Sequence, residues 1–405
     1  MNITETDVCR SNGKYTNYDS LFPITYWYGP PSEKTTNAVY RQIAEAGFTV
    51  ASPMCASPGS VEQNIKMLDC CLANGIKAII YDSRMPDILK GVPEWKNLLR
   101  AIADDYRDHP ALYAYYLTDE PDTTKFGMLA DVVAELRSID PQHIAYINLF
   151  PNYATKDQLR ADSYTGYVRS YIDTCKPSFV SYDHYHFLSV KPPQASDKSG
   201  DSREDMIREA AMINVDRAGF FDNLEVVRKL CLEYNLPFMV IVLLIQHGPY
   251  RYLHEPEIRF EVFQSLCYGA EYLSYFTYWT VMDENSWWLW QEALIDRDGT
   301  VLDHYYGVRK VNRDLAAYGR ILKGRKSLKV MHTGEEKENV THFVPDETVR
   351  SISGNVRLTI GEFEGNIVAV ANKDIRNEAV FSIDICGKEH KITLAPGDMI
   401  LFEDQ

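Results

Sequence analysis

Residues 112–121 read LYAYYLTDEP. Six apolar residues in a row, followed by polar residues and a proline, are typical of a short strand that is buried on both faces and ends in a loop. Such strands occur almost only in parallel sheets that are covered by helices. The stretch therefore predicts an α/β protein.

The chain contains seven more runs of this kind, separated by segments with helical spacing. The runs span residues 24–30, 48–53, 76–84, 143–152, 177–187, 237–247 and 270–280. Two of the helical segments, 36–47 and 60–75, end at a glycine, which is common directly after a helix. Eight strand–helix units in series favour a closed (β/α)8 TIM barrel over an open sheet, and no GxGxxG motif follows the first run to indicate a dinucleotide site.

The pattern changes near residue 323. Residues 326–405 carry short alternating runs, such as VRLTIGEF at 356–363, which are typical of an antiparallel β-sandwich. The longest insert in the barrel, residues 188–222, begins with a polar stretch and is expected to form a lid or a wall of the active-site cleft. We predict an N-terminal tail over 1–20, a catalytic barrel over 21–322 and a C-terminal all-β sandwich over 323–405.

Composition excludes several classes of partner. The net charge of −15 and the lack of a Lys/Arg stripe argue against binding of nucleic acid. No run of about 18 apolar residues predicts a membrane span.

Residues 1–20 lack the basic and apolar regions of a secretory signal, so we expect either a cytoplasmic protein or an exported one whose signal has been replaced. Aromatic residues reach 12%, which suits either a surface that stacks on flat ligands such as sugars or simply a core rich in aromatic residues.

In a (β/α)8 barrel the chemistry lies at the C-terminal ends of the strands, so the polar and aromatic residues that end the apolar runs are the candidates. As substrate-binding residues we predict Trp27, Asp82, Asp119, Tyr182, His184, Gln246, Tyr278 and Trp279, together with Trp287 from the loop that follows the last run. Trp287, Trp288 and Trp290 with Asp283 and Glu284 form an aromatic, acidic loop on the same face. Exposed indole rings stack on pyranose rings, although one or two of these tryptophans could instead plug the barrel mouth.

Glu120 is the leading catalytic candidate. It directly follows a buried apolar strand and precedes Pro121, which fixes the turn. A partly desolvated carboxyl group has a raised pKa and can donate a proton to a leaving oxygen. The alternative is structural, because Asp119 and Glu120 precede a helix and could stabilise its N-terminus.

Asp119-Glu120-Pro121 resembles the Asn/Asp-Glu-Pro motif of the large clan of retaining glycoside hydrolases built on a (β/α)8 barrel, in which the glutamate is the acid/base. Residues 258–279 and 293–315 also look like the last barrel units of β-galactosidase-like bacterial glycosidases, and VAVANKD at 368–374 is similar to a strand of their C-terminal sandwiches. The likeness covers most of the chain, and its specific parts are the DEP motif and the YFTYW segment at 275–279. The resemblance implies that the protein hydrolyses O-glycosidic bonds, and it favours a protein that is exported from the cytoplasm.

The sequence departs from that clan in one respect. The clan's nucleophile is a glutamate at the end of the seventh strand, where this chain has Ile245-Gln246-His247. Asp183, at the end of the sixth run, could act as a base on water opposite Glu120 if the two groups lie about 6.5–9.5 Å apart, as inversion requires. Alternatively Glu255 or Glu257 could reach the cleft as a nucleophile. We prefer Asp183, because Glu255 and Glu257 flank a proline at a helix start and suit the first turn.

Two other functions stay open. His184 and His186 share one face of their strand and could bind a metal, although they lack a third ligand nearby in the sequence. A barrel without the seventh-strand nucleophile could also bind glycan without cleaving it. We predict a glycosidase that acts on an oligo- or polysaccharide, needs no cofactor or metal, and has Glu120 as general acid and Asp183 as second carboxylate. Sugar, linkage, anomeric outcome and oligomeric state are left open.

Overall fold

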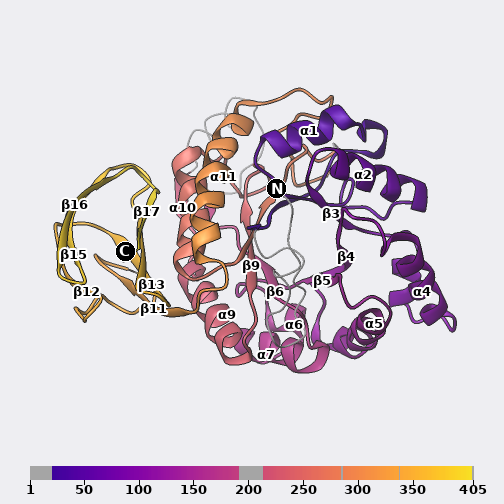
Figure 1. The fold of residues 1–405 in the computed structure, drawn as a ribbon, viewed down its shortest axis with the longest axis horizontal. Coiled ribbons are helices and arrows are strands. Elements are labelled where there is room, and N and C mark those ends of the chain that lie inside the picture. Colours follow the sequence, from indigo (N-terminus) through magenta and orange to yellow (C-terminus); the bar gives the residue numbers. More distant parts are fainter. Residues whose placement is uncertain (1–20, 191–212, 284–285, 337, 404–405) are drawn as a thin grey trace, which may run out of the picture.

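The computed structural model describes residues 21–190, 213–283, 286–336 and 338–403. Its largest part is a ring of parallel strands surrounded by helices (Figure 1). The strands are β1 (Ile24–Trp27), β2 (Val50–Ala51), β3 (Lys77–Ile80), β4 (Leu112–Asp119), β5 (Ile144–Asn148), β6 (Val180–Asp183), β9 (Phe238–Leu243) and β10 (Tyr272–Phe276). Each lies within one of the eight apolar runs, and the predicted barrel is confirmed.

Two parallel arcs make up the barrel. One has the strand order β1-β10-β9-β6 and the other β2-β3-β4-β5. Parallel bridges between Gly29 and Met54, and between Leu149 and Tyr182, join the arcs at both seams. The barrel therefore has no free edge between these strands.

Helices cover the outer face of the barrel. They are α1 (Asn37–Glu45), α2 (Val61–Ala73), α4 (Trp95–Tyr106), α5 (Phe126–Ile139), α7 (Tyr164–Cys175), α9 (Phe220–Tyr234), α10 (Glu255–Cys267) and α11 (Asp303–Leu322), with the short helices α3 (Met85–Leu89) and α6 (Lys156–Leu159). Local sequence sets their ends: Ser60 and Gln63 form a capping box before α2, and Gly75 follows α2 with a φ of 69°. None of the helices in the described ranges is both long and apolar enough to cross a bilayer.

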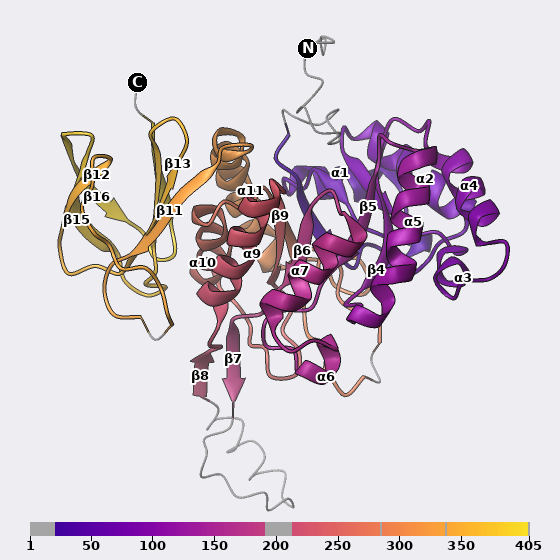
Figure 2. The same ribbon diagram turned by 90° about the horizontal axis from the view of Figure 1, so that it is seen from below.

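An antiparallel hairpin follows β6. It consists of β7 (Phe187–Val190) and β8 (Ile213–Asp216) and projects from one end of the barrel (Figure 2). The predicted lid over 188–222 falls partly on residues 191–212, which lie outside the described residues. The same holds for the tail over 1–20 and for Glu284.

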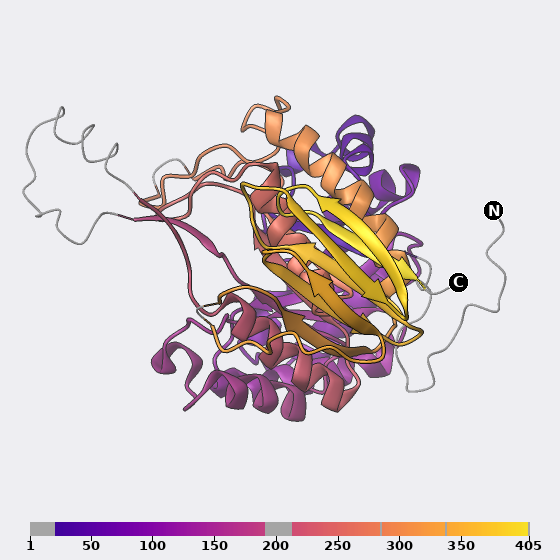
Figure 3. The same ribbon diagram turned by 90° about the vertical axis from the view of Figure 1, so that its left-hand side faces the viewer.

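The C-terminal domain is a sandwich of two antiparallel sheets beside α10 and α11 (Figure 3). One sheet holds β11 (Ser327–His332), β13 (Leu358–Phe363), β14 (Ile367–Asn372) and β17 (Met399–Glu403), and the other holds β12 (Val349–Ser353), β15 (Ala379–Ile385) and β16 (Lys388–Leu394). Its core includes Ile360, Val370 and Phe381. The sheet meets α10 so closely that a Cβ on Gly361 would lie 2.2 Å from the carbonyl oxygen of Cys267, so a glycine is required there.

Candidate active site

The C-terminal ends of the barrel strands surround a cleft of about 370 Å³. Active sites of (β/α)8 barrels lie at this face, and the volume is in the range of small-ligand sites. The cleft is lined by Trp27, Asp119, Glu120, Asn148, Phe150, Pro151, Tyr153, Ala154, Gln158, Asp183, Tyr185, Ile241, His247, Tyr250, Phe276, Trp288 and Trp290. Its floor is acidic and its walls are mainly aromatic.

Glu120 is held in an unusual backbone conformation. Its φ is 44°, a left-handed value that a non-glycine residue rarely adopts. The Glu120 backbone N–H donates a hydrogen bond of 2.9 Å to the carbonyl oxygen of Asn148 on the neighbouring strand, which fixes this turn. Such conformations cost about 1–3 kcal/mol and cluster at functional sites. The turn directs the Glu120 side chain into the cleft.

Asn148, at the end of β5, links two of the cleft's carboxylates. Its Nδ2 donates to Oδ1 of Asp119 at 3.0 Å and to Oδ1 of Asp183 at 3.1 Å. The Ser181 hydroxyl donates to Oδ1 of Asn148 at 2.8 Å, which fixes the orientation of the amide. Asn148 is buried, so this small network sets the positions of both aspartates.

Glu120 and Asp183 share a hydrogen bond between their carboxyl groups. Burial and the negative charges of Asp183 and Asp119 raise the pKa of Glu120 far above that of an ordinary glutamate. Burial and the charge of Asp119 also raise the pKa of Asp183, but hydrogen bonds from Asn148 and Glu120 oppose that rise. The shared proton therefore resides on Glu120, whose O–H donates a hydrogen bond to the Asp183 carboxylate.

Asp119 completes the acidic floor. Asp119 is exposed to the solvent of the cleft that it lines. The protein atoms packed around it still desolvate its carboxylate and raise the pKa of Asp119 to about 6, against the opposing effect of the Asn148 hydrogen bond. At neutral pH Asp119 is thus largely ionised and its charge favours the protonated state of Glu120.

Aromatic rings from several loops form the cleft wall. Arg217, which follows β8, orders part of this wall: it donates to the carbonyl oxygen of Tyr185 at 3.1 Å and to the hydroxyl of Tyr250 at 3.2 Å. Its guanidinium also lies 3.9 Å from the ring centroid of Tyr153. The hairpin insert is therefore fastened to the cleft by a cation that contacts three aromatic residues.

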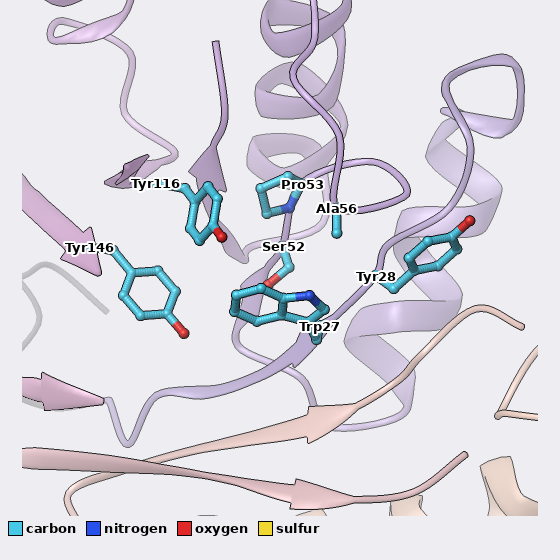
Figure 4. Close-up of a pocket in the computed structure, with 7 residues that line it drawn as sticks. All are labelled: Trp27, Tyr28, Ser52, Pro53, Ala56, Tyr116 and Tyr146. Atoms are coloured by element: carbon cyan, nitrogen blue, oxygen red, sulfur yellow. The ribbon is translucent and has the colours of Figure 1, made fainter. Parts of the chain in front are cut away.

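Trp27 separates the cleft from a smaller recess. Figure 4 shows its indole with Tyr116 and Tyr146 on one side and Tyr28 on the other. The recess has a volume of about 10 Å³, room for about one water molecule. Trp27 is packed edge-on against Tyr116 at 5.5 Å between centroids, so its ring is a rigid part of the cleft wall.

The structure brings together four of the predicted site residues, Trp27, Asp119, Glu120 and Asp183. The other predicted residues do not line the cleft. Asp82 is buried and bound by Arg84 at 2.7 Å and by the Tyr106 hydroxyl at 2.6 Å. Gln246 lies beyond the end of β9 and is half-buried outside the lining.

The remaining predicted residues take other positions for packing reasons. Tyr182, Tyr278 and Trp279 are fully buried in the barrel core. Tyr182 points away from the cleft because it precedes the cleft-facing Asp183 on β6. His184 is buried against Tyr153 and Phe220. Trp287 is 72% exposed and lies outside the lining, stacked on Trp288.

The side chains of residues 183–186, from the last residue of β6 onward, alternate in direction. Asp183 and Tyr185 line the cleft, while His184 and His186 face away from it and pack on Phe220. No group of three potential metal-ligating side chains occurs within the described part of the chain. Glu255 and Glu257, the alternative candidates for a nucleophile, lie in the first turn of α10. This is the structural position that their place beside a proline at a helix start predicted.

Several cleft residues were not assigned from the sequence. Asn148 was visible as a polar strand end but was given no role. Tyr153, His247 and Tyr250 come from loops, where periodicity carries no signal. Trp288 and Trp290, by contrast, belong to the aromatic loop that the sequence places on this face, and both line the cleft. Burial lowers the pKa of His247 to about 4, so its imidazole is neutral in the cleft.

Glu261 on α10 supports the site from behind. It is fully buried, and its two oxygens accept hydrogen bonds from the backbone N–H groups of His186 at 3.2 Å and Leu243 at 3.1 Å. We predict that Glu261→Gln lowers the free energy of unfolding by about 1–3 kcal/mol, because the amide NH₂ would face a buried N–H donor. Urea denaturation measures this loss. Glu233→Gln, which breaks an exposed ion pair with Arg169, is the control and should cost much less stability than Glu261→Gln. An equal loss in both variants would contradict the prediction.

No protein-family model matches the chain, and no curated protein matches it in sequence. Solved structures do match in fold. A glycoside hydrolase aligns at a TM-score of 0.55 and 11% identity over 97% of this chain and 92% of its own. A family 39 glycoside hydrolase from the gut symbiont Bacteroides cellulosilyticus aligns at 0.53 and 10% identity, covering 97% and 82%. A β-galactosidase from the psychrophilic Marinomonas ef1 aligns at 0.50 and 12% identity over 72% of this chain, which spans only 59% of that enzyme. The chain thus has the TIM-barrel fold of these glycosidases.

Proposed function

We propose that this protein is a glycoside hydrolase that uses Glu120 as its general acid. The observation that carries the proposal is a carboxyl group kept protonated by burial and by two neighbouring carboxylates, in an aromatic-lined cleft at the barrel's C-terminal face. A group that holds its proton at neutral pH can give it to the glycosidic oxygen as the C–O bond breaks. The similarly folded proteins that are named glycoside hydrolases support this class of activity.

Asp183 is the second carboxylate in this proposal. The two carboxyl groups share a hydrogen bond, so they lie closer than the roughly 6.5–9.5 Å of an inverting pair or the roughly 5 Å of a retaining pair. Asn148 anchors Asp183 by a second hydrogen bond, whereas the Glu120 carboxyl is held through its hydrogen bond to Asp183. A sugar that binds between them would move Glu120 rather than Asp183 and make room for a water molecule.

The shared hydrogen bond then has a function at the end of the reaction. Glu120 gives its proton to the leaving oxygen, and water attacks the anomeric carbon while Asp183 takes a proton from that water. After hydrolysis Glu120 is ionised and Asp183 is protonated. When the product leaves, the hydrogen bond re-forms and returns the proton to Glu120, which has the higher affinity for it.

A panel of aryl glycosides and neutral glycans tests the proposal. The wild type should release reducing sugar from at least one of them, and NMR of the first-formed anomer should show inversion. A retained anomer would remove Asp183 as the base but leave Glu120 as the acid. Lack of hydrolysis across the panel, with glycan still bound in affinity electrophoresis, would favour the alternative of a glycan-binding barrel, for which the observation is the missing carboxylate after β9.

A further inference from the structure

A row of aromatic rings leads from inside the cleft to the protein surface. The His247 ring stacks on Trp290 at 4.6 Å between centroids, and Trp290 lies 6.2 Å from Trp288. Trp288 in turn stacks on Trp287 at 3.9 Å. Trp288 and Trp290 line the cleft, whereas Trp287 lies beyond it, so the row continues outward from the catalytic centre.

Trp287 offers a flat apolar face to solvent. One face of its indole rests on Trp288, and the side chain is 72% exposed. Stacking on Trp288 restrains the ring, so a ligand that packs on its free face orders few additional bonds. Core packing does not explain an exposed tryptophan in this position, but a sugar ring that extends from the cleft would cover it.

The charges around the cleft restrict the sugar. None of the described residues that line it is a lysine or arginine, and its floor carries three carboxyl groups. The nearby cation, Arg217, uses its guanidinium on Tyr185, Tyr250 and the ring of Tyr153. An anionic sugar would therefore meet repulsion with no free positive partner in the lining.

We infer that the substrate is an uncharged glycan chain of several sugar units, one of which stacks on Trp287 outside the catalytic cleft. The inference rests on the proposed hydrolase function and specifies its substrate class. The subsite is defined by the exposed face of Trp287 and its contact with Trp288.

Trp287→Ala tests the subsite, with Leu289→Ala as the matched control. Leu289 is 68% exposed in the same loop, so its removal deletes apolar surface without a ring. We expect Trp287→Ala to lower kcat/KM about fivefold to tenfold on long neutral oligosaccharides, which is the size of effect expected for the loss of one ring contact. The loss should become progressively smaller on shorter oligosaccharides. Trp287→Phe should recover part of the loss, and Leu289→Ala should show no dependence on chain length.

Three results would overturn the inference. The first is an equal loss on all chain lengths, and the second is faster cleavage of uronic-acid or sulfated glycans than of neutral ones. The third is a change of sedimentation coefficient in Trp287→Ala, which would identify the patch as a subunit contact. If the wild type hydrolyses nothing, the proposed function fails, but affinity electrophoresis in gels of a neutral polysaccharide still tests the subsite: weaker retention of Trp287→Ala than of Leu289→Ala supports it, and equal retention refutes it.

Discussion

Glu120→Gln should lower kcat by about 10²- to 10⁴-fold while glycan binding is retained, because the amide keeps the shape of the side chain but has no proton to give to the leaving oxygen. The loss should depend on the leaving group. A dinitrophenyl glycoside departs with little protonation, so its hydrolysis should fall much less than that of an alkyl glycoside. Steady-state kinetics on both substrates, with affinity electrophoresis for binding, measure the effect.

This dependence separates an acid from a structural residue. If Glu120 only stabilised the turn before Pro121, its replacement would reduce the rates on good and poor leaving groups alike. Glu292→Gln is a suitable control, because Glu292 is an exposed acid in the loop after β10 and lies outside the cleft lining. Equal losses on both substrates, or a fall in thermal stability that explains the loss, would remove Glu120 as proton donor.

The sequence predicted the barrel because its strands are buried on both faces. Runs such as LYAYYL at 112–117 and FMVIVLL at 238–244 are continuous and apolar, which is a signal that does not depend on distant contacts. The hairpin β7–β8 was not predicted. Its strands are short and partly exposed, with little apolar alternation, so the segment was visible only as an insert.

The site was predictable where strand geometry alone determines a residue's direction. Asp119, Glu120 and Asp183 follow strands whose ends meet at one face, and all three line the cleft. Asp82 has the same sequence context, but its position is decided by Arg84 and Tyr106, the latter 24 residues away. Such partners are chosen by the tertiary fold and leave no periodic signal. The loop tryptophans show the same limit, because only the fold places Trp288 inside the cleft and Trp287 outside it.

Asp183→Asn should abolish most activity and shift the pH dependence of what remains. Burial raises the pKa of Glu120 most, and the Asp183 carboxylate raises it further, by its negative charge and by accepting the hydrogen bond from the protonated form. A neutral amide removes the charge, so Glu120 should lose its proton at lower pH. Because the protonated form is the active one, the alkaline limb of the kcat/KM profile should move to lower pH, and carbon-13 NMR of labelled glutamate should show the same change in the pKa of Glu120.

The pH dependence of folding stability is a second, independent test of the interaction between Glu120 and Asp183. Both carboxyl groups have raised pKa values in the folded state, so the folded protein binds their protons more tightly than the unfolded chain. Stability contributed by the pair is therefore present at low pH and is lost as the pH rises from about 4, the ordinary carboxyl value, through the raised folded-state values. Asp183→Asn removes the contribution of Asp183 to this loss and reduces that of Glu120, so the melting temperature of the variant relative to the wild type should rise steadily from pH 5 to pH 8. If the melting temperatures of the two proteins changed with pH in parallel across that range, the carboxyl groups would not interact. An alkaline limb of the kcat/KM profile at an unchanged pH would lead to the same conclusion.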